Sequence, residues 1–86
     1  MNDSEIRERI EKLENEERHL RSEEQQAAEA DHREVLKPDR DRLADIRIEL
    51  DQLWDLLRQR KALQDAGRNP NDAQLRDPGT VEGYLG

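Results

Sequence analysis

The 86-residue sequence contains no cysteine and no phenylalanine, and it has only one tryptophan and one tyrosine. Without cysteine, the chain has neither a disulfide framework nor a thiolate metal site. No stretch approaches the ~20 apolar residues that a membrane span requires, and the first residues show neither the basic nor the apolar region of a signal peptide. We therefore expect a one-domain cytoplasmic protein with no membrane partner.

Hydrophobic residues make up 31% of the chain and charged residues 43%, with a formal net charge of -7. This composition cannot seal a thick core, which leaves disorder, an elongated helical structure or an oligomer. The apolar residues are periodic rather than scattered, which argues against disorder. Because the acidic balance repels phosphate backbones and no block of basic residues offsets it, we expect no nucleic-acid partner.

The first predicted helix covers about residues 4–31. Asp3 and Ser4 are residue types that favour an N-cap. The apolar residues that follow recur at spacings of four, three, seven and seven: Ile6, Ile10, Leu13, Leu20 and Ala27. This stripe is only about 80° wide at ~100° per residue, so the helix can cover one neighbour and hardly more.

A bend is predicted over about residues 32–38, because Pro38 suits the first turn of a new helix. The second predicted helix covers about residues 39–66 and ends at the glycine signal of Gly67. Its apolar seam has the three-four spacing of a coiled coil: Leu43, Ile46, Leu50, Leu53 and Leu57. Residues 1–67 are therefore predicted to form an all-α, coiled-coil-like antiparallel helical hairpin.

The hairpin also has a predicted register. A bend centred near residue 34 pairs Leu20 with Leu50 and Leu13 with Leu57. Acidic residues open the second helix and basic residues close it, as the helix dipole favours. Folding back then places the basic end beside the glutamates of the first helix, which favours the antiparallel arrangement.

The second helix is predicted to have more apolar surface than the first helix can cover. Trp54, Leu56 and Leu63 widen its apolar arc from about 100° to roughly 180°. A flank is therefore expected to face water in a single chain, and its candidate residues are Leu53, Trp54, Leu56 and Leu63. Exposed patches of this kind usually mark an interface, and we predict a homodimer in which two hairpins form a four-helix bundle. The predicted interface residues are Leu53, Trp54, Leu56, Leu57 and Leu63. A monomeric coiled-coil adaptor is the alternative.

The tail, residues 68–86, contains two prolines and cannot be one continuous helix. Thr80 is a suitable cap for a short turn near residues 80–85. In such a turn Val81, Tyr84 and Leu85 share one face, because they stand at positions i, i+3 and i+4. The turn is a candidate for docking on the hairpin, on the dimer mate or on an unidentified protein partner; a frayed terminus is the alternative.

Two Glu-x-x-His patterns have the ligand spacing of four-helix carboxylate metalloproteins. Their residues are Glu16, His19, Glu29 and His32. The two pairs lie about 20 Å apart along one helix, and neither histidine falls on the apolar seam. Metal binding therefore stands as an alternative function, and we predict no cofactor.

No nucleophile can be matched with a base partner, and the sequence has no glycine-rich phosphate loop. We therefore predict that the protein is not an enzyme. A further alternative function is binding to an anionic surface, because Trp54 is followed closely in the sequence by three cationic residues. These cations are Arg58, Arg60 and Lys61.

Three segments carry a resemblance to a known family: residues 50–63 (LDQLWDLLRQRKAL), residues 66–70 (AGRNP) and residues 81–85 (VEGYL). Together they resemble a domain-of-unknown-function family of short actinobacterial helical proteins. The resemblance implies an actinobacterial, cytoplasmic protein and brings no activity, ligand or catalytic residue. We therefore predict a non-enzymatic protein–protein interaction or assembly module.

Overall fold

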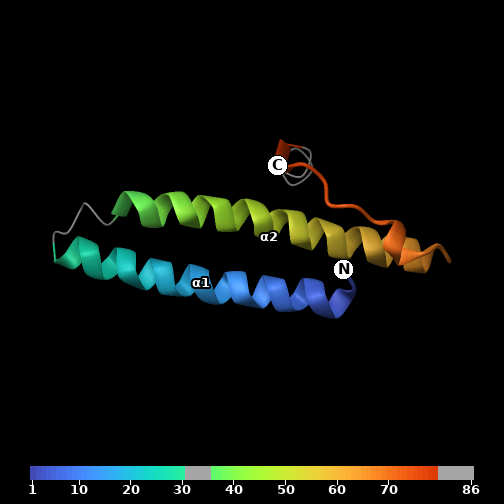
Figure 1. The fold of residues 1–86 in the computed structure, drawn as a ribbon, viewed down its shortest axis with the longest axis horizontal. Helices are drawn as coiled ribbons and strands as arrows, with labels where there is room; N and C mark the ends of the chain where they lie inside the picture. Colours follow the sequence, from blue (N-terminus) through green and yellow to red (C-terminus); the bar gives the residue numbers. More distant parts are fainter. Residues whose placement is uncertain (31–35, 80–86) are drawn as a thin grey trace.

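A computed structural model of the chain describes residues 1–30 and 36–79, and the backbone of this part forms two long helices and a short one. Helix α1 spans Asp3–Glu29, helix α2 spans Leu36–Asp65, and the 3-10 helix η2 spans Pro70–Asp72. The two long helices lie side by side in opposite directions (Figure 1). The result is an elongated body of 55 × 25 × 15 Å, and the predicted all-α helical hairpin is confirmed.

Helix α1 begins with a capping box. The side chain of Asn2 accepts a hydrogen bond from the backbone amide of Glu5 at 2.8 Å. In return, the Glu5 carboxylate accepts one from the backbone amide of Asn2 at 3.1 Å. The two side chains satisfy amides that the first helical turn leaves without partners. The N-cap is therefore Asn2, and the prediction of Asp3 or Ser4 in this role is wrong by one or two residues.

Helix α2 begins earlier than predicted. It starts at Leu36, so Lys37 and Pro38 belong to its first turn, and the predicted bend over residues 32–38 extends too far. Proline is tolerated here because the amides of the first turn have no partner within the helix. Residues 31–35 lie outside the described part of the chain.

Helix α2 ends in the way that its glycine signal predicts. Gly67 adopts a positive φ of 71°. Its amide donates to the Gln64 carbonyl at 3.0 Å, and the Arg68 amide donates to the Leu63 carbonyl at 2.7 Å. This pair of bonds is a Schellman motif, which needs a left-handed residue that glycine supplies without steric cost.

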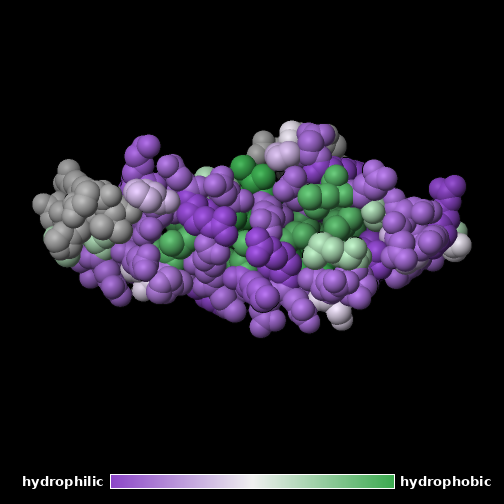
Figure 2. Space-filling view, viewed as in Figure 1, coloured by the Kyte–Doolittle hydropathy of each residue, from purple (hydrophilic) through white to green (hydrophobic). Residues whose placement is uncertain are grey.

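The core lies along the seam between the two helices. Its buried members come from both: Ile6, Ile10 and Leu13 of α1, and Ile46, Leu53, Leu56 and Leu57 of α2. Figure 2 shows hydrophobic patches along the middle of one face, surrounded by hydrophilic side chains. A seam of this width agrees with the low hydrophobic content of the chain.

The register of the hairpin differs from the predicted one by about one heptad. Ion pairs join Asp3 to Arg60, Arg9 to Glu49, and Glu16 to Arg42. These pairs place Leu57 near the level of Ile6, so the predicted pairing of Leu13 with Leu57 is wrong. A seam that repeats every seven residues keeps apolar groups in contact after a shift of seven, so the apolar pattern alone does not fix the register.

The chain after α2 turns back and runs along that helix toward its middle (Figure 1). We call the returning part, residues 70–79, the strap. It begins with η2, where the side chain of Asn69 accepts a hydrogen bond from the Asn71 amide at 2.9 Å. Ala73 of the strap packs against the core cluster. The strap is thus a third layer on the hairpin.

Candidate interaction surfaces

The five predicted interface residues do not form one exposed flank. Leu53, Leu56 and Leu57 are buried, at 4%, 7% and 9% exposure, and Leu63 is half-buried, whereas Trp54 is 42% exposed. The expectation that Leu53 and Leu56 face water in a single chain is wrong. Trp54 and Leu56 stand about 200° apart around the helix at ~100° per residue, so they flank the seam on opposite sides.

The strap covers the flank that contains Leu56. Two glutamines of α2 hold its backbone: Gln52 donates to the Arg76 carbonyl at 3.0 Å, and Gln59 donates to the Gln74 carbonyl at 2.8 Å. The Gln74 amide also donates to the Gln59 side chain at 3.4 Å. A side-chain amide that both donates to and accepts from one residue imitates the backbone pairing of a strand. These contacts bind the strap through its main chain.

A buried carboxylate adds a charged contact to the strap. The side chain of Asp55 is only 6% exposed, and its Oδ1 lies 3.6 Å from Nη1 of Arg76. Its Oδ2 accepts a hydrogen bond from Gln59 at 2.8 Å. Buried charges need such partners because their desolvation is costly. Asp55 therefore fixes both the strap and the glutamine that binds the strap.

Arg60 joins three parts of the chain. It is buried on α2, and its Nε donates to Asp3 of α1 at 2.5 Å. Its Nη1 donates to the Pro70 carbonyl at 3.2 Å and to the Asn71 side chain at 3.1 Å. The proposed role of Arg60 in an anionic-surface patch is wrong, because the guanidinium is buried and paired. Its position seven residues after Leu53 is a signal that places it on the seam.

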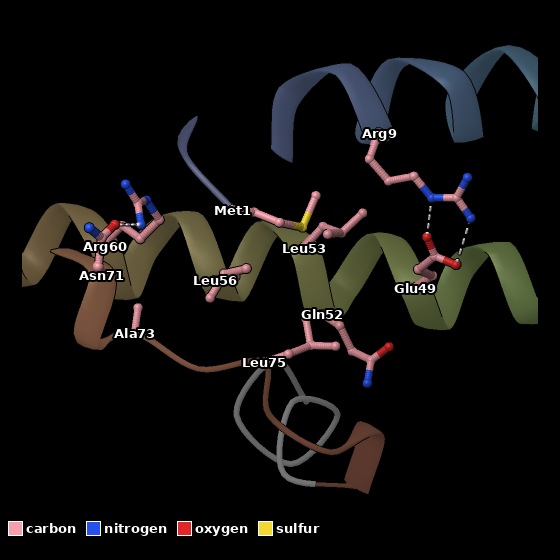
Figure 3. Close-up of a pocket in the computed structure, with 10 residues that line it drawn as sticks. All are labelled: Met1, Arg9, Glu49, Gln52, Leu53, Leu56, Arg60, Asn71, Ala73 and Leu75. Atoms are coloured by element: carbon pink, nitrogen blue, oxygen red, sulfur yellow. Dashed lines mark hydrogen bonds and ion pairs between the residues drawn. The ribbon is translucent and has the colours of Figure 1, made fainter. Parts of the chain in front are cut away.

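A groove with an apolar floor lies between the start of α1, helix α2 and the strap (Figure 3). Its volume is about 580 Å³. Its apolar lining consists of Met1, Leu53, Leu56, Ala73 and Leu75. Met1 and Leu75 are largely exposed, so apolar surface continues from the floor of the groove to its rim.

Charged pairs stand at the two ends of the groove. At one end, Arg9 makes a bidentate contact with Glu49, with distances of 2.6 and 3.1 Å. The hydrogen bond and the charge of Glu49 raise the pKa of Arg9. At the other end stands Arg60, which is paired with Asp3. Because both cations have carboxylate partners, the apolar floor of the groove favours an occupant that presents an apolar face.

Trp54 forms one wall of a shallower cleft on the opposite flank of α2. The cleft has a volume of about 480 Å³, and Leu57 lies in it beside charged side chains of both helices. Leu43, Leu50, Trp54 and Leu57 form one stripe, because their spacings of seven, four and three residues return to one side of a helix. Leu43 and Leu50 are half-buried, so this stripe is only partly covered by α1.

The predicted metal ligands have other partners. Glu16 accepts from Nε of Arg42 at 2.5 Å and from Nη2 at 2.9 Å, and these contacts lower its pKa. His19 Nε2 lies 2.9 Å from Glu23, and Glu29 accepts from Gln25 at 3.3 Å. His32 lies outside the described residues. Within residues 1–30 and 36–79, no group of three or more candidate ligands is arranged to hold a metal ion.

Asp39 is an ionisable group in an unfavourable position. Its Oδ2 is buried, and no hydrogen-bond partner for that atom exists among the residues that the structure describes. Burial, and next the carboxylates of Glu23 and Glu24, raise the pKa of Asp39. The sequence gives no sign of this cluster, because its members come from both helices and meet only in the observed register.

The described helices include none that is long and apolar enough to cross a membrane. The predicted tail-docking residues, Val81, Tyr84 and Leu85, lie outside the described part of the chain. The polar contacts within that part include ion pairs, hydrogen bonds between side chains, and side-chain bonds to the backbone. Fold and contacts together define a small two-helix protein in which the strap, residues 70–79, covers one flank of the second helix.

The chain belongs to the family described as protein of unknown function (DUF2630), whose model matches residues 2–86. Three mycobacterial sequences are similar to this chain. These are the uncharacterized proteins Mb0922c of Mycobacterium bovis, and MT0921.1 and Rv0898c of Mycobacterium tuberculosis. Each is 58% identical to this chain over 41 residues.

Each of these matches covers 48% of this chain and 47% of the relative, so the chain spans about half the length of the curated relatives it matches. No solved structure matches the chain significantly. The resemblance to an actinobacterial domain-of-unknown-function family is therefore confirmed.

Proposed function

We propose that the protein is a non-enzymatic protein–protein interaction module that forms a homodimer through the Trp54 flank of α2. The observation that carries the proposal is the 42% exposure of Trp54, the only tryptophan of the chain. Tryptophan is enriched among the residues that dominate binding energy at interfaces. An exposed tryptophan beside partly covered leucines is therefore a reasonable centre for a contact.

The rest of the stripe supports a helix as the partner. Leu43, Leu50, Trp54 and Leu57 extend over about 21 Å of α2 at ~1.5 Å per residue, which is a length suited to another helix. A second copy offers the same stripe, and packing α2 against α2 gives a four-helix bundle. This assembly removes Trp54 from water and covers the open sides of Leu43 and Leu50.

A monomeric coiled-coil adaptor is the second candidate function, and the strap is the observation that favours it. The strap covers the Leu56 flank within one chain, which reduces the apolar surface that a second copy would have to cover. The two candidates differ in oligomeric state and in the role of Trp54. In the adaptor, the Trp54 flank binds a different protein.

Sedimentation velocity over a wide range of protein concentration separates the two candidates. For the homodimer we expect the sedimentation coefficient to rise with concentration toward the value of a two-chain species. Trp54→Glu should abolish this rise, because a charged side chain at the centre of the contact loses apolar burial and is costly to desolvate.

Ala44→Glu is the matched control, because it adds the same charge to an exposed position of the same helix. This variant should associate as the wild type does. A wild-type chain that sediments as a monomer at all concentrations rules out the homodimer and leaves the adaptor. Equal association by both variants places any contact away from Trp54.

A further inference from the structure

The apolar groove suggests an occupant from within the chain. The strap ends at Gly79, which is the last residue that the structure describes, and seven residues of the sequence follow it. We propose that this C-terminal segment, residues 80–86, folds back into the groove of its own chain and buries Val81, Tyr84 and Leu85 against Leu53, Leu56 and Leu75. The proposal concerns the flank opposite Trp54 and does not depend on the homodimer.

The first support is position. Leu75 lines the groove, and Gln52, which also lines it, binds the carbonyl of Arg76. Gly79 is only three residues further along the chain. Seven residues reach about 23 Å when extended at ~3.3 Å per residue, whereas the groove spans about 16 Å of α2 from Glu49 to Arg60 at ~1.5 Å per residue. An extended segment is therefore long enough to reach every part of the groove, and as a helical turn at ~1.5 Å per residue its seven residues cover about 10 Å of it.

The second support is local backbone structure at the end of the strap. Pro78 and Gly79 have helical geometry, and Asp77 precedes them. Aspartate followed by proline is a common helix start, because aspartate is a preferred N-cap and proline fits the first helical position. A helical turn that starts there directs Val81, Tyr84 and Leu85 to one face.

The third support is chemical fit. The floor and rim of the groove are apolar, and the cations at its two ends have carboxylate partners. An apolar face is the complement of such a surface. Tethering also favours this occupant, since a short flexible link gives an effective concentration in the millimolar range. A second copy at micromolar concentration competes poorly with a segment that is attached beside the site.

The test is a nuclear Overhauser measurement on the full-length chain. Tyr84 is the only tyrosine and the chain has no phenylalanine, so its ring signals have to be distinguished only from those of one tryptophan and two histidines. We expect contacts between the Tyr84 ring protons and the methyl groups of Leu53 and Leu56. In a mixture of labelled and unlabelled chains, these contacts should appear within one chain and be absent from the spectrum filtered for contacts between chains.

Leu75→Glu should abolish these contacts, and the variant should fold because Leu75 is 55% exposed. Gln74→Glu is the matched control, since it adds the same charge at the neighbouring exposed position and should keep them. The proposal is overturned if Tyr84 contacts no groove methyl group or contacts Trp54 instead. It is also overturned if the groove contacts appear only between chains, because the occupant is then a second copy. Loss of the homodimer in sedimentation leaves this result unchanged.

Discussion

The guanidinium of Arg60, buried on α2, donates to the carboxylate of Asp3 in the first turn of α1 across a distance of 2.5 Å. The same guanidinium binds the Pro70 carbonyl and the side chain of Asn71. One side chain therefore connects the start of the first helix, the end of the second and the beginning of the strap. The contact also fixes the register of the hairpin, because only one alignment brings these residues together.

Arg60→Ala should destabilise the protein by about 2 kcal/mol, because hydrogen bonds to charged groups contribute about 1.5–3 kcal/mol to stability. The loss stays in this range because Asp3, the carboxylate left without its partner, is half exposed and can be hydrated. Urea denaturation measures this loss. The exposed neighbour Lys61 is the control, and Lys61→Ala should change stability by no more than about 0.5 kcal/mol. Equal effects of the two substitutions contradict the role given to Arg60.

Gln59→Ala should loosen the strap without unfolding the hairpin. The substitution removes the two hydrogen bonds to residue 74 and one to Asp55. The Gln74 amide loses its acceptor, and the strap loses at least about 1 kcal/mol of contact. Hydrogen exchange of this amide should therefore speed up by at least roughly fivefold, while amides in the middle of α1 keep the wild-type rate. Gln64→Ala, at an exposed position of the same helix, should leave the exchange of Gln74 unchanged. Fast exchange of Gln74 in the wild type would argue against a bound strap.

Asp39→Asn should stabilise the protein at neutral pH. The pKa of Asp39 is raised from its ordinary value of 3.8, so the folded state binds a proton more readily than the unfolded state does. The stability of the wild type therefore falls as the pH rises through this raised pKa. Asparagine has no charge and therefore avoids the cost of ionising the Asp39 carboxyl. The higher stability of the variant should vanish below pH 3.8, where the wild type is protonated in both states. Thermal denaturation at several pH values measures this, and an advantage that persists in acid would exclude titration as its cause.

Glu16→Gln should have the opposite pH dependence. Arg42 lowers the pKa of Glu16 below its ordinary value of 4.5, so this contact stabilises the fold above pH 4.5. The contribution is lost as the pH falls through the lowered pKa. The variant should be less stable than the wild type at neutral pH and equal to it in strong acid. The effect should be small and should weaken with added salt, because the pair is largely exposed.

The sequence predicts the helices well because both follow from local signals. The apolar seam from Ile6 to Ala27 identifies α1, and the glycine at position 67 ends α2 through its left-handed backbone. The register is a weaker prediction, since a heptad seam tolerates a shift of seven residues. The pairs of Asp3 with Arg60 and of Arg9 with Glu49 select one register, and such pairs are recognised only once the helices are aligned.

The strap is the element that the sequence does not predict. Gln52 and Gln59 hold it through backbone atoms, and such contacts leave no periodic pattern in the sequence. Because the apolar pattern does not reveal the strap, it places Leu56 on an exposed flank together with Trp54, and this prediction is wrong. The prediction of a wide apolar arc on α2 is correct, but the two edges of this arc have different neighbours. One edge lies under the strap, and the other carries an exposed tryptophan.

In the proposed homodimer, Trp54 is open in the single chain and becomes covered when two chains associate. Because Trp54 is the only tryptophan, acrylamide quenching of its fluorescence measures this directly. We predict strong quenching in dilute protein and weaker quenching, with emission shifted to shorter wavelength, as the concentration rises. Quenching that stays the same at every concentration while the chain dimerises would contradict the claim.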